Sequence, residues 1–246
     1  MARNRVVVVE DDAALRRFVA LALADLDVDL VQCADTAQAM AALQAAPARL
    51  VITDLMMPGE PGYVLIERLR ADPALRAGAR VAVFSAGLTP PVQQRLAALG
   101  VWRFLVKPVS VEALERCVLD ALADGTDEPP SPKLPMPSSG DRCGPARAVT
   151  AHFGGDQALY DAFLATCRLQ FQADLEQGEA FLRTRDADGL RRLAHSLKSV
   201  LLTLGHEAAS AHAHSLEDAC AGAAPWPDIR HFWLVVHDEL AALAAR

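Results

Sequence analysis

Three short polar segments stand where apolar, strand-like runs of this chain end. They are Glu10-Asp11-Asp12 after Val6–Val9, Asp54 after Leu50–Thr53, and Lys107 after Arg103–Val106. If these runs are strands of one parallel sheet, their carboxyl ends bring carboxylates and an amine into one pocket. Carboxylates packed that closely repel one another unless a divalent cation lies between them, and oxygen ligands suit a hard cation such as Mg²⁺. The pattern therefore predicts a Mg²⁺ site at Glu10, Asp11 and Asp54, with Asp54 as a nucleophile that accepts a phosphoryl group.

Three further residues join Lys107 as candidates for the same pocket. We expect the backbone carbonyl of Met56 to ligate the metal. Lys107 is placed to neutralise the charge that develops on a transferring phosphoryl group, and a cis peptide between Lys107 and Pro108 would aim this amine inward. Ser85 ends another strand-like run and can donate its hydroxyl to a phosphoryl oxygen, and we expect Phe104 to rotate inward when it does. A single strand-end aspartate is more often a solvated loop residue, but the joint pattern favours the functional interpretation.

Strand-like and helix-like patterns of apolar residues alternate over the first 122 residues. The expected strands are Val6–Glu10, Val28–Cys33, Leu50–Thr53, Val81–Ser85 and Arg103–Val106. Helical patterns separate them; Pro91 opens the fourth, Gly100 ends it, and Ser110 caps the fifth. Five strands alternating with five helices predict an α/β fold with a doubly wound, five-stranded parallel sheet.

Four separated motifs give these 122 residues a family resemblance. The segments VVVVEDD, VITDLMMPGEPGY, VFSAG and FLVKP occur in this order, and with them the region resembles a response-regulator receiver domain. The resemblance implies that Asp54 accepts its phosphoryl group from a phosphohistidine and shares a Mg²⁺ ion with Glu10 and Asp11. It also implies that Ser85 and Lys107 contact the phosphate. Phe104 departs from the many members that carry tyrosine, so the switch lacks that hydroxyl's hydrogen bond.

The composition changes after the last expected helix. The stretch 124–145 contains six prolines, together with several serines and glycines, and this predicts an extended linker without a packed core. The remaining chain is helical throughout. Its expected helices are Gln157–Thr184, Asp186–Leu204, Glu207–Ala221 and Asp228–Ala245, which predict an antiparallel four-helix bundle. We therefore expect a receiver domain at 1–122, a linker at 123–145 and a helical domain at 146–246.

One histidine in the second of these helices has a chemically useful neighbour. His195 and Lys198 are one turn apart and can approach the same ligand. The leucine and valine stripe of this helix leaves His195, Lys198, Ser199 and Leu202 on another face, which we expect to be the outer one. A ring nitrogen of His195 can then accept a phosphoryl group that the lysine steadies. A lone helical histidine is more often structural or solvated.

The sequence around His195 adds a second resemblance. The segment AHSLKSVLLTLG resembles the signature of histidine-phosphotransfer (HPt) domains, and the likeness covers about residues 146–246. It implies that His195 is a phosphoacceptor. Ser199 departs from the glycine most often found there, but serine is still small enough to let a partner approach. Other histidines have no recognised metal-ligand spacing.

Charge and composition exclude several classes of protein. The apolar content is 52% and the net charge is −7, with 14 acidic and 13 basic residues over 1–122, and 13 acidic and 9 basic residues over 146–246. Neither part predicts a basic face for nucleic acid. No apolar run is long enough to cross a bilayer, and the N-terminus does not resemble a signal peptide. Five scattered cysteines favour a reducing compartment, so we expect the cytoplasm.

These patterns predict a two-component phosphorelay protein. A sensor histidine kinase is expected to phosphorylate Asp54, and His195 to exchange phosphoryl groups with receiver domains; whether Asp54 serves His195 of the same chain stays open. No nucleotide-binding motif is present, so we expect self-catalysed phosphoryl transfer and phosphoaspartate hydrolysis but no ATP-dependent kinase activity. The alternative is a phosphorylation-switched binding or dimerisation module in which the helical domain only engages a partner. A transcription factor fits poorly.

Overall fold

The computed structural model describes residues 4–86, 88–123 and 144–245, which form two compact units, one α/β and one all-helical. Nearly all of the expected linker, residues 124–143, lies outside the described residues. None of the helices in the described part of the chain has the length and apolar character needed to cross a bilayer.

The α/β unit contains one sheet of five parallel strands. The strands are β1 (Arg5–Val9), β2 (Asp29–Cys33), β3 (Leu50–Thr53), β4 (Arg80–Ser85) and β5 (Arg103–Val106). Their spatial order is β2-β1-β3-β4-β5, and each neighbouring pair is parallel. The predicted α/β fold and its five strands are confirmed. Because β1 and β3 are adjacent, the residues that follow them meet at the same edge of the sheet.

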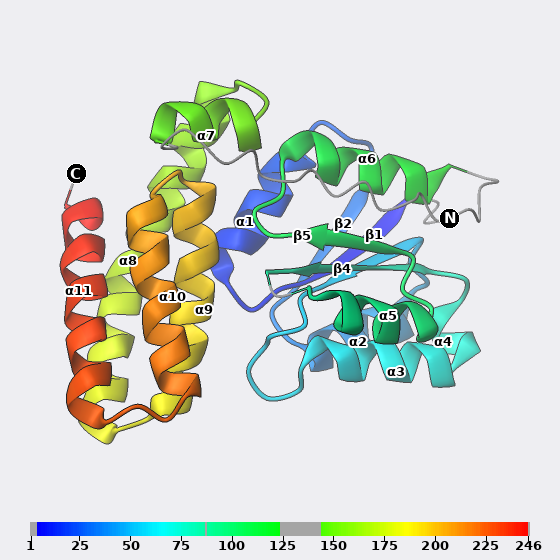
Figure 1. The fold of residues 1–246 in the computed structure, drawn as a ribbon. Coiled ribbons are helices and arrows are strands. Elements are labelled where there is room, and N and C mark those ends of the chain that lie inside the picture. Colours follow the sequence, from blue (N-terminus) through cyan, green and yellow to red (C-terminus); the bar gives the residue numbers. More distant parts are fainter. Residues whose placement is uncertain (1–3, 87, 124–143, 246) are drawn as a thin grey trace. The chain divides into compact units, whose positions relative to one another are not determined.

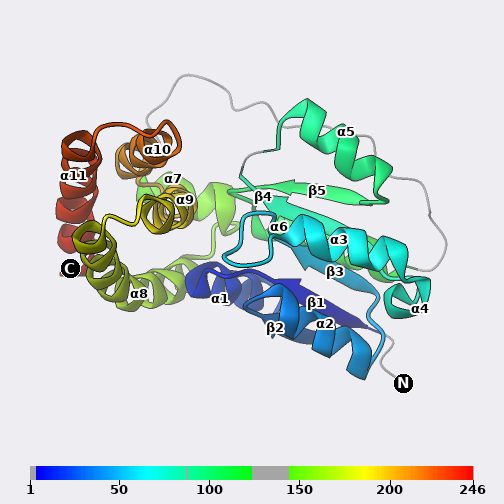
Figure 2. The same cartoon turned by 90° about the horizontal axis from the view of Figure 1, so that it is seen from below.

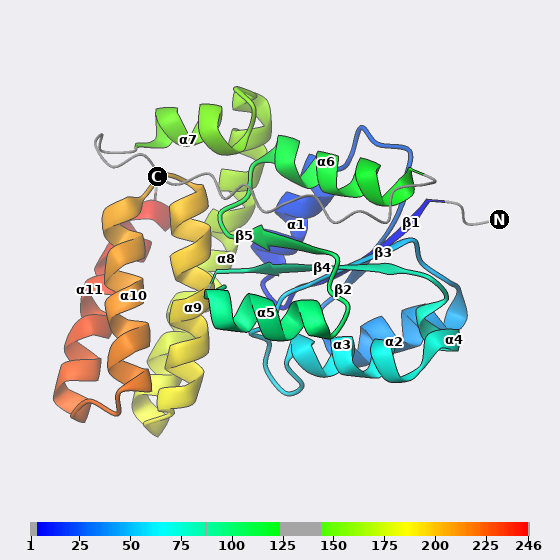
Figure 3. The same cartoon turned by 45° about the vertical axis from the view of Figure 1, so that its right-hand side comes forward.

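Helices connect the strands. They are α1 (Ala13–Ala22), α2 (Thr36–Ala45), α3 (Gly62–Ala71), α4 (Pro73–Arg76), α5 (Pro90–Ala98) and α6 (Val111–Leu122). Figures 1 and 3 show α6 over one face of the sheet and α2, α3 and α5 over the other. Ser110 accepts a hydrogen bond from the N–H of Ala113, as its predicted capping role requires. The short α4 was not predicted; Asp72 caps it and Pro73 is its first residue.

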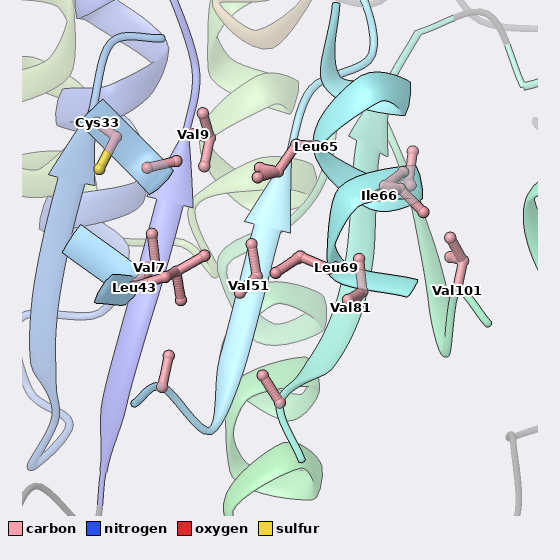
Figure 4. Packing of buried hydrophobic residues seen from close by; sticks show 14 of the residues in the cluster. Val7, Val9, Cys33, Leu43, Val51, Leu65, Ile66, Leu69, Val81 and Val101 are labelled. Carbon is pink, nitrogen blue, oxygen red and sulfur yellow. The ribbon is translucent and has the colours of Figure 1, made fainter. Parts of the chain in front are cut away.

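Apolar side chains from the strands and from α2, α3 and α5 form the core on that face (Figure 4). Val7, Val51 and Val81 point from three neighbouring strands toward Leu43 of α2 and Leu69 of α3. Strands that are covered on both faces have nearly continuous apolar sequences, as β1 (RVVVV) and β3 (LVIT) do. This packed core fixes the positions of the strand ends, which the polar residues directly follow.

The helical unit contains the four expected helices and one more. They are α7 (Pro145–His152), α8 (Gln157–Thr184), α9 (Ala187–Thr203), α10 (Glu207–Ala221) and α11 (Trp226–Ala244). Figure 2 views α9 and α10 nearly end-on, with α8 and α11 beside them. The four-helix prediction is confirmed for α8 to α11. Helix α7 was missed because Pro145, its first residue, was assigned to the linker, although proline is well suited to the first position of a helix.

The bundle contains one especially close helix contact. A Cβ atom on Gly178 of α8 would lie 2.0 Å from Cη2 of Trp233 on α11, and Trp233 is fully buried. Glycine is therefore required at 178 for the indole to pack against the backbone of α8.

We expect Gly178→Ala to destabilise the helical unit. Helix propensity alone would favour alanine by about 1 kcal/mol, whereas the clash with Trp233 costs roughly 1–3 kcal/mol or more, so the melting temperature should fall. Thermal unfolding followed by circular dichroism measures this, with Gln177→Ala on the exposed side of the same helix as the control. A melting temperature that rises in Gly178→Ala would contradict the close contact.

Candidate functional site

The acids that follow β1 and β3 form one cluster. The N–H of Asp54 donates to the carbonyl of Val9 at 2.9 Å, which continues the β1–β3 pairing to the edge of the sheet. One carboxylate oxygen from each of Glu10, Asp11 and Asp54 lies within 4.8 Å of the other two. Glu10 and Asp54 are buried, whereas Asp11 is partly exposed. The structure thus brings together the three carboxylates that the sequence placed at one pocket.

Lys107 reaches this cluster from β5. Its Nζ lies 2.6 Å from Oδ2 of Asp54 and 2.7 Å from Oε2 of Glu10, and all three side chains are nearly inaccessible to solvent. The same ammonium lies 4.6 Å from the ring centroid of Phe84. A long side chain is needed here because β4 separates β5 from β3. Lys107 therefore holds a buried positive charge between two carboxylates.

Burial dominates the electrostatics of the cluster. Loss of solvation raises the pKa of Glu10 well above its ordinary value of 4.5, although Lys107 partly opposes this. Burial, together with the nearby charge of Asp54, raises the pKa of Asp11 to about 6. Burial alone would lower the pKa of Lys107, but the carboxylates of Glu10 and Asp54 outweigh it and raise that pKa above 10.5. Lys107 compensates part of the negative charge of the cluster, and three carboxylate oxygens suit a hard divalent cation.

The backbone fixes the orientation of the Asp54 carboxylate. Its Oδ1 accepts the N–H groups of Leu55 at 2.5 Å and of Met56 at 3.1 Å, while Lys107 binds Oδ2. The first turn of α3 packs directly behind this residue. A Cβ atom at Gly62 would lie 1.8 Å from the carbonyl oxygen of Asp54, so only glycine fits there. The sequence contained this glycine within VITDLMMPGEPGY, but its contact with Asp54 was not predicted.

The remaining predicted pocket residues lie on or beside β3, β4 and β5. Ser85 is buried at the end of β4, between β3 and β5. Phe104 is half-buried on β5 and packs against the hydrophobic core. The Lys107–Pro108 peptide is cis, as the sequence allowed. The N–H of Met56 binds Asp54, whereas metal ligation by its carbonyl stays a prediction. In VFSAG, Gly87 lies outside the described residues.

A second cluster of polar side chains lies between α9 and α10. Nδ1 of His195 is 2.7 Å from Oε1 of Glu217, and Nζ of Lys198 is 2.5 Å from Oε2 of the same carboxylate. His195 and Lys198 project from α9, one turn apart, and Glu217 projects from α10. The predicted pair on α9 thus shares an acidic partner.

The expectation that His195 and Ser199 lie on an outer face is wrong. The His195 side chain is 8% exposed and Ser199 is buried. The small residues Ala209, Ser210 and Ala213 are buried on α10, and they let the two helices approach closely. Ser210 Oγ donates to the carbonyl of Lys198 at 2.8 Å. Helix α10 therefore covers a side of α9 that the apolar stripe alone left open.

The protonation of the His195 ring follows from its partner. Burial raises the pKa of Glu217, but hydrogen bonds from His195 and Lys198 outweigh this and lower the pKa to about 2. An ionised carboxylate only accepts hydrogen bonds, so Nδ1 of His195 carries a proton. In the neutral ring Nε2 then keeps its lone pair. Nε2 is buried and has no hydrogen-bond partner among the described residues.

The sequence did not identify Glu217. It directly follows Leu216, which belongs to the buried stripe of α10, and an acidic residue beside such a stripe is common on solvated helices. Only the position of α10 against α9 reveals its partners. The same packing makes Glu217 the charged group nearest to Nδ1 of His195.

The described residues thus contain an acidic cluster at the edge of a doubly wound sheet and a helical bundle with a buried histidine. Residues 6–119 match the family model of the response regulator receiver domain, and residues 162–246 match that of the Hpt domain. The chain thus combines a response regulator receiver domain with an Hpt domain. Neither matched family is an ATP-dependent kinase domain.

Several known proteins are similar to this chain. The virulence sensor protein BvgS of Bordetella pertussis is 30% identical over 223 residues, which are 87% of this chain and 18% of BvgS. The DNA-binding transcriptional regulator NtrC of Azospirillum brasilense is 30% identical over 126 residues, 51% of this chain and 26% of NtrC. Among solved structures, the chemotaxis protein CheY4 of Vibrio cholerae is 25% identical with a TM-score of 0.45, and the match covers 48% of this chain and 97% of CheY4. The chain spans less than a fifth of BvgS.

We expect the ion pairs of Glu217 to make the helical unit acid-sensitive. The pKa of Glu217 is about 2 in the folded chain and 4.5 ordinarily, so its stabilisation is present above pH 4.5 and is lost as the pH falls toward 2. The loss is of order 1–3 kcal/mol. This loss of stability is measured by urea unfolding at pH 7, 4 and 3. The experiment uses a Trp102→Phe background, so that the fluorescence of Trp226 and Trp233 reports on the helical unit. Glu217→Gln should flatten the pH dependence, whereas the exposed neighbour change Asp218→Asn should not; equal slopes in both would contradict the assignment.

Proposed function

We propose that this chain accepts a phosphoryl group on Asp54 from a sensor histidine kinase and exchanges phosphoryl groups with receiver domains through His195. The observation that carries the proposal is the oriented Asp54 carboxylate, which two backbone N–H groups and Lys107 hold beside Glu10 and Asp11. The expected domain limits are 1–122 for the receiver, 123–145 for the linker and 146–246 for the Hpt domain. These limits and the cytoplasmic location are part of the proposal.

At the first site, an oxygen of Asp54 attacks the phosphorus of a phosphohistidine on the kinase. The new P–O bond forms as the P–N bond breaks, and the kinase imidazole leaves with the electron pair. Lys107 compensates the charge that builds up on the phosphoryl oxygens, and the Ser85 hydroxyl donates to one of them. Glu10, Asp11, Asp54 and the Met56 carbonyl would hold Mg²⁺, which supplies further charge compensation when bound.

At the second site, Nε2 of His195 attacks the phosphorus of an aspartyl phosphate. The P–N bond forms, the bond from phosphorus to the aspartate oxygen breaks, and the carboxylate leaves with the electron pair. The proton on Nδ1 stays on the ring, where the hydrogen bond to Glu217 holds it and stabilises the positive charge that develops. Lys198 keeps Glu217 oriented and is the nearest ammonium to a phosphoryl group on this face.

The burial of His195 favours a second candidate function. A buried imidazole fits a module in which phosphorylation of Asp54 switches binding and the helical domain only engages a partner. The relay proposal therefore requires docking of a receiver to expose Nε2. Its lone pair without a hydrogen-bond partner in the described chain supports the relay, because buried polar atoms are rarely left unpaired without a reason.

We expect Asp54→Asn to abolish Mg²⁺-dependent labelling by acetyl phosphate and to leave the fold intact. An amide is not an anionic nucleophile, so labelling should fall to background, and chelating Mg²⁺ with EDTA should have the same effect on the wild type. Autoradiography with circular dichroism checks both, and Asp25→Asn on the exposed surface is the control. Labelling that persists in Asp54→Asn and still requires Mg²⁺ would refute the assignment of Asp54.

A transfer assay between two full-length variants distinguishes the phosphorelay proposal from the binding-module alternative. The donor is His195→Gln labelled on Asp54, and the acceptor is a size-tagged Asp54→Asn chain in which His195 is the remaining candidate acceptor. We expect label to reach this acceptor but not the matched double variant Asp54→Asn/His195→Gln. Because the cognate donor is unknown, a panel of other phosphorylated receivers is tested in parallel. The binding module would gain support if no donor labels either acceptor.

A further inference from the structure

The Glu217 carboxylate has a third basic neighbour that the proposed reaction does not use. Nδ1 of His214 lies 3.7 Å from Oε2 of Glu217, the oxygen that also binds Lys198. Nε2 of His214 lies 3.6 Å from Oδ2 of Asp218. The other carboxylate oxygen, Oε1, binds Nδ1 of His195. One carboxylate therefore connects the candidate acceptor histidine to a second histidine.

The two histidines differ sharply in their exposure to solvent. The side chain of His214 is 57% exposed, compared with 8% for His195, 14% for Glu217 and 20% for Lys198. The ring of His214 is therefore open to the solution, and imidazole is the side chain whose charge can change in the physiological pH range. It is the solvent-facing member of a network whose other members are largely enclosed.

The charged groups around His214 come from two helices. Its own helix, α10, contributes Glu217 and Asp218, and α9 contributes Lys198 and His195 through the shared carboxylate. The other helix packed against α10 is α11. Its Glu239 lies 2.9 Å from Nδ1 of His212 rather than beside His214. Protonation of His214 thus acts mainly on Glu217 and Asp218.

A proton on His214 changes how Glu217 shares its charge. Lys198 already places one cation at Oε2, and protonated His214 places a second beside the same oxygen. Because the two oxygens share one negative charge, stronger attraction at Oε2 makes Oε1 a weaker acceptor. The bond from Nδ1–H of His195 then weakens, and the ring loses electron density at Nε2.

We propose that His214 is a positioning residue whose protonation slows phosphoryl acceptance at His195 by drawing the Glu217 carboxylate away from it. The inference rests on the proposed role of His195. Neutral His214 leaves Oε1 available to His195, so transfer is faster. Acidification should therefore slow transfer more in the parent chain than in a chain without His214.

The test uses full-length acceptors in the Asp54→Asn background with one phosphorylated donor. We expect the parent rate to fall between pH 8 and pH 6 by roughly two- to fivefold more than the rate of His214→Gln, a range that corresponds to the coupling of an exposed ion pair. His214→Lys, with a permanent charge, should be slower than the parent at pH 8. His212→Gln, whose ring contacts Glu239, is the matched control and should follow the parent.

A second readout does not need transfer. The ¹⁵N chemical shift of Nε2 in His195, followed by NMR between pH 5 and 9, should follow a different pH dependence in the parent and in His214→Gln, whereas His212→Gln should follow the parent. Matching pH dependence of this shift in the parent and in His214→Gln would overturn the inference. If no donor labels any acceptor, the phosphorelay proposal fails, and the NMR titration alone decides the role of His214.

Discussion

The compensation of buried charge is the constraint on which both candidate sites depend. In the α/β unit, Lys107 lies between Glu10 and Asp54, all three out of solvent. Removing such charges from water is costly unless each has a partner. The sheet provides the partners by ending β1, β3 and β5 at one edge, and the close approach at Gly62 lets α3 begin directly behind Asp54. The acidic cluster is therefore a consequence of strand order.

The helical unit also compensates buried charge, here between one carboxylate and two basic groups. Glu217 stays ionised in a largely enclosed position because His195 and Lys198 both donate to it. The arrangement also selects the tautomer of His195 and leaves Nε2 as the basic nitrogen. The two units thus present different candidate nucleophiles, an oxygen of Asp54 and a nitrogen of His195. Hydrogen bonds orient both side chains.

Much of this was predictable from local patterns. Apolar runs ending in acids located the strands and the Glu10, Asp11 and Asp54 cluster, because strand order and parallel pairing bring such ends together. Contacts between segments distant in sequence were not predictable in the same way. Glu217 is one acidic residue among many on helices, and Gly62 is one glycine in a loop-rich segment. The face of His195 was wrongly predicted because the leucine stripe defines only one side of α9, whereas α10 covers another with small residues.

The most direct measurement is to map the phosphoryl groups on the wild-type chain by mass spectrometry. The protein is incubated with Mg²⁺ and acetyl phosphate, or with a phosphorylated receiver, and is then analysed before and after brief alkaline treatment. Alkali cleaves an acyl phosphate and spares a phosphoryl group on a ring nitrogen. We predict an alkali-labile phosphoryl group at Asp54 and an alkali-stable one at His195. A phosphoryl group on other side chains only, or none at His195 with any donor, would contradict the account.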